Sequence, residues 1–279
     1  MQINSKENII NTTSIRPLAL VTGASSGIGY ELARLFASDG HDVIITATGQ
    51  NDGLTKTADA IRACDAVAIV TEADLTSFDG VEAVAAAVKN TGRPLAAAAL
   101  NAGVDVGGHF VGGTDLAAEL SMIQLNIASQ VHLTKRLLPD MVERAAGRLL
   151  YTASISGTMP TPFEAVYGGT KAFLISFVEA IKEETKDSGV SFTLLLPGEV
   201  DTNFWHRAGM DTSTLGLGEK AAPTKVAKEG YDAMNAGRER VVAGKAGSKV
   251  IGRVLNNVLP DSKKAASHAT GAEPGSGVA

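Results

Sequence analysis

Short apolar runs alternate along this chain with longer stretches whose apolar residues recur at helical spacing. The runs are rich in branched side chains and lie at residues 18–22, 42–46, 66–70, 95–100, 148–153, 191–196 and 240–242. Strands that alternate with helices pair in parallel through right-handed crossovers, and unbroken apolar strands belong in a sheet covered on both faces. The pattern predicts one α/β domain with a doubly wound, Rossmann-type parallel sheet of about seven strands and helices on both faces.

The run LAAAAL at residues 95–100 is the weakest strand candidate, because alanine favours helices. Pro94 precedes the run and Asn101-Ala102-Gly103 follows it. Turn signals on both sides of so short a run favour a strand over a helix.

Both ends of the chain differ in composition from the domain predicted over residues 16–244. Residues 1–15 are polar and are predicted to form a flexible tail, and residues 266–279 are small or polar and are predicted to be disordered. An amphipathic helix is expected over 245–265, with Pro260 as its stop signal. We expect that helix to pack on its own domain or on a sister subunit in preference to a membrane surface.

Charge and cysteine content exclude several classes of function. The formal net charge is -5, so nothing indicates a basic surface for nucleic acid. Cys64 is the one cysteine and lies far from any histidine cluster, so we expect no intrachain disulfide, metal site or thiol catalysis. The polar N-terminal stretch lacks the apolar core of a signal peptide, which predicts a cytoplasmic location.

A glycine-rich stretch, Thr22 to Gly29, directly follows the first apolar run and opens a helix. Glycines at 23, 27 and 29 permit a tight turn and close approach of backbone N–H groups to a pyrophosphate, which the helix N-terminus stabilises. A plain strand-to-helix turn is the alternative. The position after the first strand favours a dinucleotide site.

This stretch, TGASSGIG, resembles the TGxxxGIG cofactor loop of the compact, single-domain branch of the short-chain dehydrogenase/reductase family. Three further segments resemble family motifs: Asp74-Leu75 near the adenine, Asn101-Ala102-Gly103 with Leu100 in place of a first asparagine, and Pro197-Gly198 with Thr202 over the nicotinamide. The resemblance implies cofactor contacts from Gly23, Ser25, Ser26, Gly27, Ile28, Gly29, Thr48, Asp74, Leu75, Asn101, Ala102, Gly103, Tyr167, Lys171, Pro197, Gly198, Val200 and Thr202.

Asn126, Ser154, Tyr167 and Lys171 match the catalytic tetrad of that family. The resemblance implies that Ser154 holds a carbonyl oxygen, that Tyr167 exchanges its proton, and that Asn126 steadies a water linked to Lys171. Tyr167 and Lys171 are four residues apart and share a helix face. We expect the ammonium to lower the pKa of the phenol toward neutral pH.

Two glycines, Gly168 and Gly169, stand between the tyrosine and the lysine. We expect them to allow close backbone approach to the cofactor, with local slack in the helix as the alternative. Phe204 and Trp205 lie in a predicted substrate lid over about 199–222. They indicate a partly hydrophobic carbonyl or alcohol, with packing of the lid on itself as an equal alternative. With Ser154 and Tyr167 they are the candidate substrate-binding residues.

The cofactor choice depends on the end of the second apolar run, Thr46 to Gln50, which carries neither an acid nor an arginine. An acid there would repel a 2′-phosphate, so we favour NADP(H), with NAD(H) as the alternative. The predicted function is an NAD(P)(H)-dependent oxidoreductase that acts on a small-molecule carbonyl or alcohol. A non-catalytic dinucleotide-sensing protein of the same fold is the rival, and an epimerase or dehydratase is a third reading. The resemblance also implies a homodimer or homotetramer.

Overall fold

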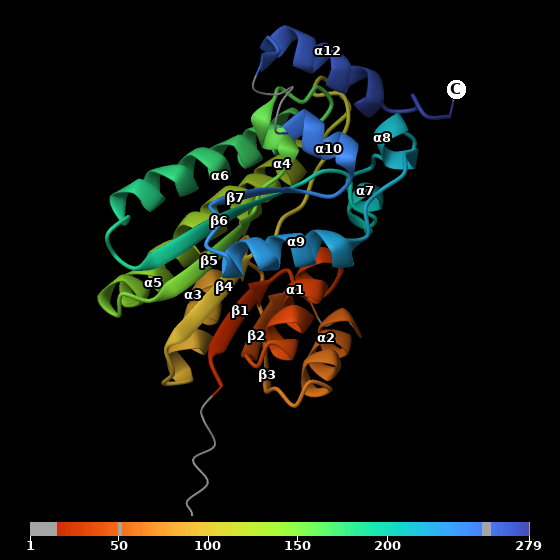
Figure 1. The fold of residues 1–279 in the computed structure, drawn as a ribbon. Helices are drawn as coiled ribbons and strands as arrows, with labels where there is room; N and C mark the ends of the chain where they lie inside the picture. The colour runs from red at the N-terminus through yellow and green to blue at the C-terminus, as the bar shows by residue number, and fades with distance from the viewer. Residues whose placement is uncertain (1–15, 50–51, 253–257, 279) are drawn as a thin grey trace, which may run out of the picture.

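The strand order of the central sheet reverses direction next to β1. The computed structural model describes residues 16–49, 52–252 and 258–278. Every pairing in its seven-stranded sheet is parallel, in the order β3-β2-β1-β4-β5-β6-β7 (Figure 1). The predicted doubly wound sheet is confirmed, and ligands bind such sheets where the order reverses. The strands are β1 (Leu18–Thr22), β2 (Asp42–Ala47), β3 (Ala68–Glu72), β4 (Leu95–Leu100), β5 (Gly147–Thr152), β6 (Val190–Pro197) and β7 (Arg240–Ala243).

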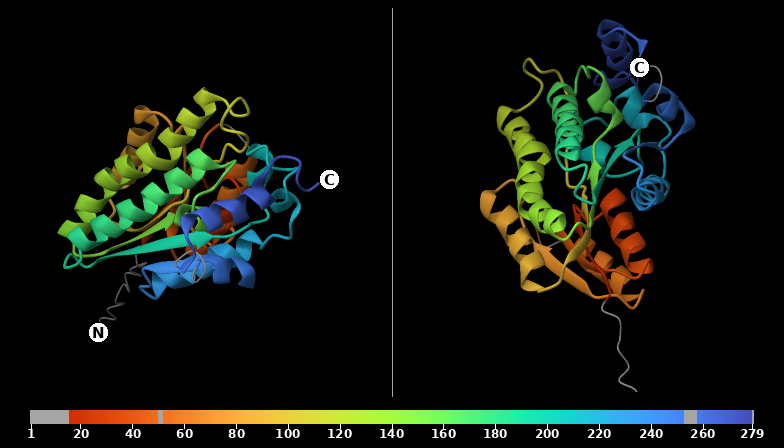
Figure 2. Two further views of the ribbon diagram at one scale, coloured as in Figure 1. Left: turned by 90° about the horizontal axis from the view of Figure 1, so that it is seen from above. Right: turned by 60° about the vertical axis from the view of Figure 1, so that its left-hand side comes forward.

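Helices cover both faces of the sheet, as Figure 2 shows from two sides. Leu18 and Leu20 of β1 face one apolar cluster, and Ala19 and Val21 face the other. Because both faces are covered, both sets of side chains must be apolar. One face carries α1 (Gly27–Ser38), α2 (Asp52–Arg62) and α9 (Pro223–Asn235). The other carries α3 (Phe78–Asn90), α5 (Ser129–Glu143) and α6 (Ala165–Glu184).

The alanine-rich run is the central strand, β4, between β1 and β5. Ala97 and Ala99 belong to the cluster under α1 and α9, and those two helices pack against each other. Small side chains in the middle of the sheet let the helices come close. Tertiary packing therefore overrides the helical propensity of alanine, and the predicted strand is confirmed.

Short helices lie over the carboxyl edge of the sheet. The segment predicted as a lid contains α7 (Phe204–Arg207) and α8 (Thr214–Leu217), and helix α4 (Leu116–Ile123) with the π-helical turn η1 (Gln124–Ala128) leads into α5. The 3-10 turn η2 (Ile155–Thr158) follows β5.

The C-terminal segment differs from the sequence prediction. Helix α10 (Ala246–Val250) lies just before the residues that the structure does not describe, and a separate helix, α12 (Asp261–Ala272), starts after Pro260 and lies beside α8 (Figure 1). Residues 266–272 are thus helical where disorder is predicted, because Ala272 is buried in a small apolar cluster with Met210. Proline suits a helix start as well as a helix stop. The predicted tail 1–15 and residues 253–257 of the predicted amphipathic helix lie outside the described residues.

Candidate active site

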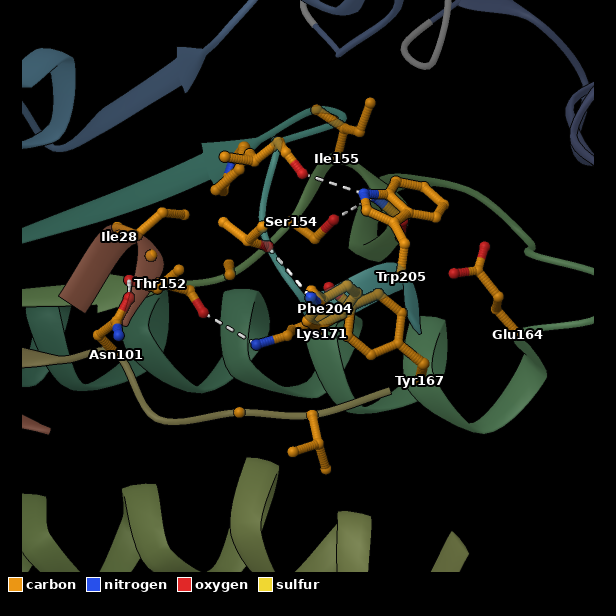
Figure 3. A pocket seen from close by; sticks show the side chains of 18 of the residues that line it. Ile28, Asn101, Thr152, Ser154, Ile155, Glu164, Tyr167, Lys171, Phe204 and Trp205 are labelled. Carbon is orange, nitrogen blue, oxygen red and sulfur yellow. Dashed lines mark hydrogen bonds between the residues drawn. The ribbon is translucent and has the colours of Figure 1, made fainter. Parts of the chain in front are cut away.

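The carboxyl ends of β1, β4, β5 and β6 meet around one cavity of about 490 Å³. Its walls run from the glycine-rich turn after β1, through the end of β5, to one face of α6 (Figure 3). Gly23 and Ile28 line one end, Ser154 and Tyr167 line the middle, and residues of α7, α8 and α12 line the far end. Most of the predicted nucleotide residues therefore share one cavity with Ser154, Tyr167 and Lys171, whereas Asn126 does not line it.

Glycine is required in the turn after β1. Gly23 has a φ of 65°, and an added Cβ would lie 2.9 Å from the Cα of Ala102. A Cβ on Gly29 would lie 2.1 Å from the carbonyl oxygen of Gly23. The N-cap residue of α1, Ser26, makes no side-chain capping bond within the described structure. A bare backbone turn at the positive end of a helix dipole fits the pyrophosphate of a dinucleotide.

Asn101 joins the ends of three neighbouring strands. Its backbone N–H donates to the Thr22 hydroxyl at 2.9 Å, and its side-chain amide donates to the Thr22 carbonyl at 3.1 Å. Its side-chain oxygen accepts from the Thr152 hydroxyl at 3.0 Å. Asn101 therefore holds β1, β4 and β5 in register at the point where the cavity opens.

Tyr167 and Lys171 are one turn apart on α6, and both side chains are buried. The Lys171 Nζ lies 5.6 Å from the centroid of the Tyr167 ring and donates to the Thr152 carbonyl at 3.0 Å (Figure 3). Ser154 is the N-cap of η2, and its hydroxyl oxygen accepts from the Ser156 N–H at 3.1 Å. A Cβ on Gly157 would lie 2.6 Å from the carbonyl carbon of Lys171, so glycine lets η2 pack directly on α6.

Asn126 lies in the π-helical turn η1 and is fully buried. Its amide donates to the Val104 carbonyl at 2.8 Å and to the Thr170 hydroxyl at 3.1 Å, and its side-chain oxygen accepts from the Val104 N–H at 3.0 Å. The side chain thus ties the segment after β4 to α6. A side chain at position 103 would be crowded, since a Cβ added to Gly103 would lie 3.2 Å from the Lys171 amine.

The protonation of the Tyr167–Lys171 pair differs from the sequence prediction. Burial lowers the pKa of Lys171 to about 8, with Asp105 acting in the opposite direction. Burial also raises the pKa of the Tyr167 phenol, and the charges of Asp105 and then Glu164 add to that rise, while a hydrogen bond with Ser154 opposes it. The expected lowering of the Tyr167 pKa is therefore wrong for this structure, because burial disfavours the phenolate and two carboxyl groups nearby add to that effect.

A family model described as short chain dehydrogenase matches residues 17–212, more than half of the chain. The chain belongs to the short-chain dehydrogenase family. Among curated relatives, the ketoacyl reductase HetN of Nostoc sp. is 32% identical over 189 residues, which cover 68% of this chain and 65% of HetN. The oxidoreductase UcpA of Salmonella typhimurium is 32% identical over 185 residues, which cover 66% of this chain and 69% of UcpA.

Solved structures of short-chain dehydrogenases share this fold. One from Sphingobium yanoikuyae, solved in complex with NADPH, superposes with a TM-score of 0.75 and 27% identity, over 81% of this chain and 87% of that chain. The alcohol dehydrogenase from Comamonas testosteroni that is specific for bulky-bulky ketones superposes with a TM-score of 0.72 and 23% identity, over 82% of this chain and 86% of that chain. The second likeness concerns the fold alone.

In this short-chain dehydrogenase, the cavity collects all the predicted cofactor contacts except Gly29 and Asp74. Gly29 packs against the backbone of Gly23 and so completes the turn without lining the cavity. The Asp74 carboxylate accepts from the backbone N–H and the hydroxyl of Thr76, at 2.9 and 2.8 Å, and does not line the cavity. The Asp74 carboxylate, which the sequence predicts near the adenine, is instead bonded within the local turn that leads into α3.

The structure explains only one of the two glycines of α6 by packing. A Cβ on Gly168 would lie 2.0 Å from the Thr161 hydroxyl, so this glycine lets the loop before α6 pack on the helix. Gly169 has no heavy atom within 4 Å of such a Cβ. Neither glycine lines the cavity, so the predicted approach to the cofactor is wrong. Packing of Thr161 explains the first glycine, and the second matches the alternative of local slack.

Both aromatic residues predicted for substrate binding line the cavity. The Phe204 ring lies 5.6 Å from the Tyr167 ring, centroid to centroid, in an edge contact. Trp205 donates from its indole N–H to the Val200 carbonyl at 3.0 Å, and the Lys220 amine lies 5.4 Å from the indole. The indole is therefore held in place against the cavity.

Three buried residues near Tyr167 are absent from the sequence prediction: Asp105, Glu164 and His268. A glutamate three residues before the tyrosine could have been noticed as part of the same helix start. Nothing in the sequence indicates that His268, in a stretch of predicted disorder, would reach the cavity. Across residues 16–49, 52–252 and 258–278, no helix is long and apolar enough to cross a membrane, and no group of three or more His, Cys, Asp or Glu residues could hold a metal ion.

Proposed function

We propose that this enzyme transfers hydride between a nicotinamide dinucleotide and a carbonyl/alcohol pair, with Tyr167 as general acid and base. The observation that carries the proposal is that Ser154, Tyr167 and Lys171 line the same cavity as the glycine-rich turn. The Sphingobium relative, solved with NADPH, supports a nicotinamide dinucleotide as the cofactor.

The side chains would divide the work as follows. The Ser154 oxygen accepts a backbone N–H, and its O–H, which faces the Tyr167 hydroxyl, would donate to a carbonyl oxygen bound beside both groups. Tyr167 then gives its proton to that oxygen, and Lys171, held by the Thr152 carbonyl, stabilises the phenolate that forms. In alcohol oxidation the phenolate takes the proton back. When bound, the nicotinamide dinucleotide supplies or accepts the hydride.

The experiment is a panel of carbonyls and alcohols read at the nicotinamide absorbance, with wild type and Tyr167→Phe. We expect Tyr167→Phe to lose on the order of 10²- to 10⁴-fold in turnover while it still binds the dinucleotide in a fluorescence titration. Full turnover by Tyr167→Phe would overturn the mechanism. Dinucleotide binding by the wild type with no turnover of any compound would favour a dinucleotide-sensing protein.

We further propose that NADP(H) is preferred. Ala47 and Thr48 line the cavity where β2 ends, so no carboxylate of this segment repels a 2′-phosphate. Gln50, the last residue of the predicted segment, lies outside the described residues. Titrations with NADPH and NADH compare the two affinities directly, and tighter binding of NADH would reverse the assignment.

The cavity wall favours a substrate with an apolar part beside its carbonyl. Apolar side chains make up part of the wall at the catalytic end, and they alternate with ionisable groups such as Glu164, Arg207 and His268. Substituted ketones of increasing apolar size, compared by kcat/KM, test this class. The apolar lining residues at this end are Met159, Phe204, Trp205, Leu215, Ile251 and Leu259.

We also propose a homodimer or homotetramer formed through the helices that carry the tetrad. Val142 of α5 and Phe173 of α6 expose 37% and 40% of their surface, and the Phe173 and Phe177 rings stack at 5.9 Å. Exposed aromatic side chains on one face are typical of an interface. Light scattering after size exclusion gives the oligomeric state, and a monomer at high concentration would contradict the proposal.

A further inference from the structure

Glu164 and His268 form a buried, hydrogen-bonded pair in the wall of the cavity. The His268 Nε2 lies 2.8 Å from a Glu164 carboxyl oxygen, and the exposed fractions of the two residues are 4% and 8%. Glu164 stands at the start of α6, whereas His268 belongs to α12. Both line the cavity, and the proposed transfer of hydride and proton uses neither of them. Two distant segments thus build a polar site to which the reaction itself gives no role.

The Glu164 carboxyl does not serve the start of its own helix. Glu164 is the N-cap residue of α6, a position at which short polar side chains usually bond the first backbone N–H groups. The Glu164 side chain makes no such bond within the described structure. Its carboxyl has the His268 imidazole and the Asp105 carboxyl as neighbours, and Figure 3 shows it turned toward the space beside Trp205. A group bound in the cavity can therefore reach it.

The pair lies about one helical turn from the proposed reaction centre. Glu164 precedes Tyr167 by three residues, and side chains three apart along a helix are neighbours, with Cβ atoms about 5–6 Å apart. The Tyr167 hydroxyl meets Ser154, where the carbonyl oxygen of a substrate would bind. A substituent on that carbonyl carbon therefore reaches the pair within a few bonds.

Charges of both signs line this end of the cavity. Glu164 and Glu199 supply carboxyl groups, and Arg207 and Lys264 supply cations. Lys264 also pairs with Asp261 at 2.7 Å. A substituent with a net charge of either sign would meet like charge here, which is costly. A neutral polar group meets no such penalty.

A hydroxyl is the neutral group that suits the pair in each of its protonation states. A neutral imidazole has one donor and one acceptor nitrogen, and a carboxyl accepts when ionised and can donate when protonated. A hydroxyl both donates and accepts, so it can bond to Glu164 or His268 whichever of them holds the shared proton. A methyl group in its place would leave buried polar atoms without that partner, which costs binding free energy.

We propose that the Glu164–His268 pair binds a hydroxyl group of the substrate, a few bonds from the carbonyl that is reduced. This inference rests on the proposed function and narrows its substrate class to hydroxy ketones and hydroxy aldehydes, with diols as the reduced products. The part of the substrate between its two polar ends is apolar and contacts Phe204 and Trp205, which line the same cavity. The pair acts in binding and takes no part in the transfer of hydride or proton.

The first test compares size-matched substrates with the wild-type enzyme. One series consists of 2-alkanones that carry a hydroxyl on the terminal carbon, and the other carries a methyl group in its place. The chain length is varied so that the hydroxyl lies at increasing distance from the carbonyl. We expect kcat/KM to favour the hydroxyl compound by about 10-fold or more at the best length, mainly through KM. A ratio near one at every length overturns the proposal.

Variants separate recognition of the hydroxyl from a purely structural role of the pair. Glu164→Leu removes the carboxyl, so the preference for the hydroxyl compound should disappear, whereas a structural defect alone would weaken both compounds equally. Glu164→Gln keeps a side chain that donates and accepts, and should retain part of the preference. Glu183→Leu makes the same change at an exposed site of the same helix and is the matched control. An equal preference in wild type and Glu164→Leu overturns the proposal.

The second test reads binding without turnover. Nitrogen NMR follows the His268 imidazole, whose signals are identified by their loss in His268→Gln. The titration is done with NADP⁺ present, so that the carbonyl is not reduced. The hydroxyl compound should shift the His268 signals at concentrations where its methyl counterpart leaves them in place. Equal shifts by the two compounds overturn the proposal.

Failure of the proposed function has a different signature. The wild type would then reduce no carbonyl of either series, while the hydroxyl compound would still shift the His268 signals. Failure of this inference leaves carbonyl reduction intact and gives the same kcat/KM for both members of each pair. Each variant is first checked for an unchanged circular dichroism spectrum, and if Glu164→Leu does not fold, the wild-type comparison and the NMR titration decide.

Discussion

The Lys171 amine lies 5.6 Å from the centroid of the Tyr167 ring but donates its hydrogen bond to the carbonyl of Thr152, the last residue of β5. The end of a strand thus places the positive charge, while the phenol hydroxyl has Ser154 as its hydrogen-bond partner. In a buried site such a charge acts strongly on a neighbouring proton equilibrium.

Loss of that charge should be costly for turnover. Lys171→Met keeps an unbranched apolar stem but removes the ammonium, and we expect kcat to fall about 100-fold or more because the phenolate is no longer stabilised. Steady-state kinetics on the best substrate measures the change. Lys182→Met, on the same helix but paired with Glu179 and Glu239, is the control. An unchanged kcat in Lys171→Met would contradict the proposed role.

The two neighbouring glycines of α6 form a matched pair. Gly168→Ala places a Cβ against the Thr161 hydroxyl and should destabilise the protein by about 1–3 kcal/mol through overpacking. Gly169→Ala points into open space and should stabilise it by about 1 kcal/mol, since alanine restricts the unfolded chain and favours the helix. Urea unfolding measures the free energy of unfolding of both variants. Equal changes would show that the contact with Thr161 does not affect stability.

Asp105 should make stability depend on pH. Its pKa is raised in the folded protein, so its proton is held more tightly there than in the unfolded chain. That contribution to stability is complete below pH 3.8 and is lost as the pH rises through the folded value. Asparagine has no proton to lose, so the stability of Asp105→Asn relative to wild type should increase with pH. The unfolding free energies of wild type and variant are measured in acidic and in alkaline buffer. A difference between the two proteins that is the same in both buffers would contradict this prediction.

Helix α12 should depend on His268. His268→Leu leaves the buried Glu164 carboxyl without its partner and should cost about 1–3 kcal/mol. We expect faster hydrogen exchange in residues 261–272 and a rise in KM larger than the fall in kcat, because α12 lines the far end of the cavity. His206→Leu removes an exposed histidine and is the control. Equal exchange in both variants would show that other contacts hold the helix.

Much of the fold follows from local patterns. All seven strands were predictable to within about two residues at each end, because a strand buried on both faces must be apolar throughout. The glycine-rich turn and the Tyr167–Lys171 spacing are also local, so the sequence places them on a turn and on one helix face. Even β4 could be recognised from its flanking turn signals, although its alanines favour a helix.

The surroundings of the tyrosine could not be predicted in this way. Asp105, Glu164 and His268 come from three separate segments, and the last was expected to be disordered. The spacing of Tyr167 and Lys171 predicts a lowered phenol pKa when only those two residues are considered. Burial, with two carboxyl groups adding to it, reverses that direction in the folded protein.

The sequence by itself thus determined the parallel sheet, the glycine-rich turn and the placement of Tyr167 and Lys171 on one helix face, since each depends on residues close together along the chain. Only the tertiary structure decided which form of the tyrosine is favoured and how the substrate end is closed. The reason is physical: the pKa of a buried group depends on every charge within a few ångströms, and distant segments supply those charges.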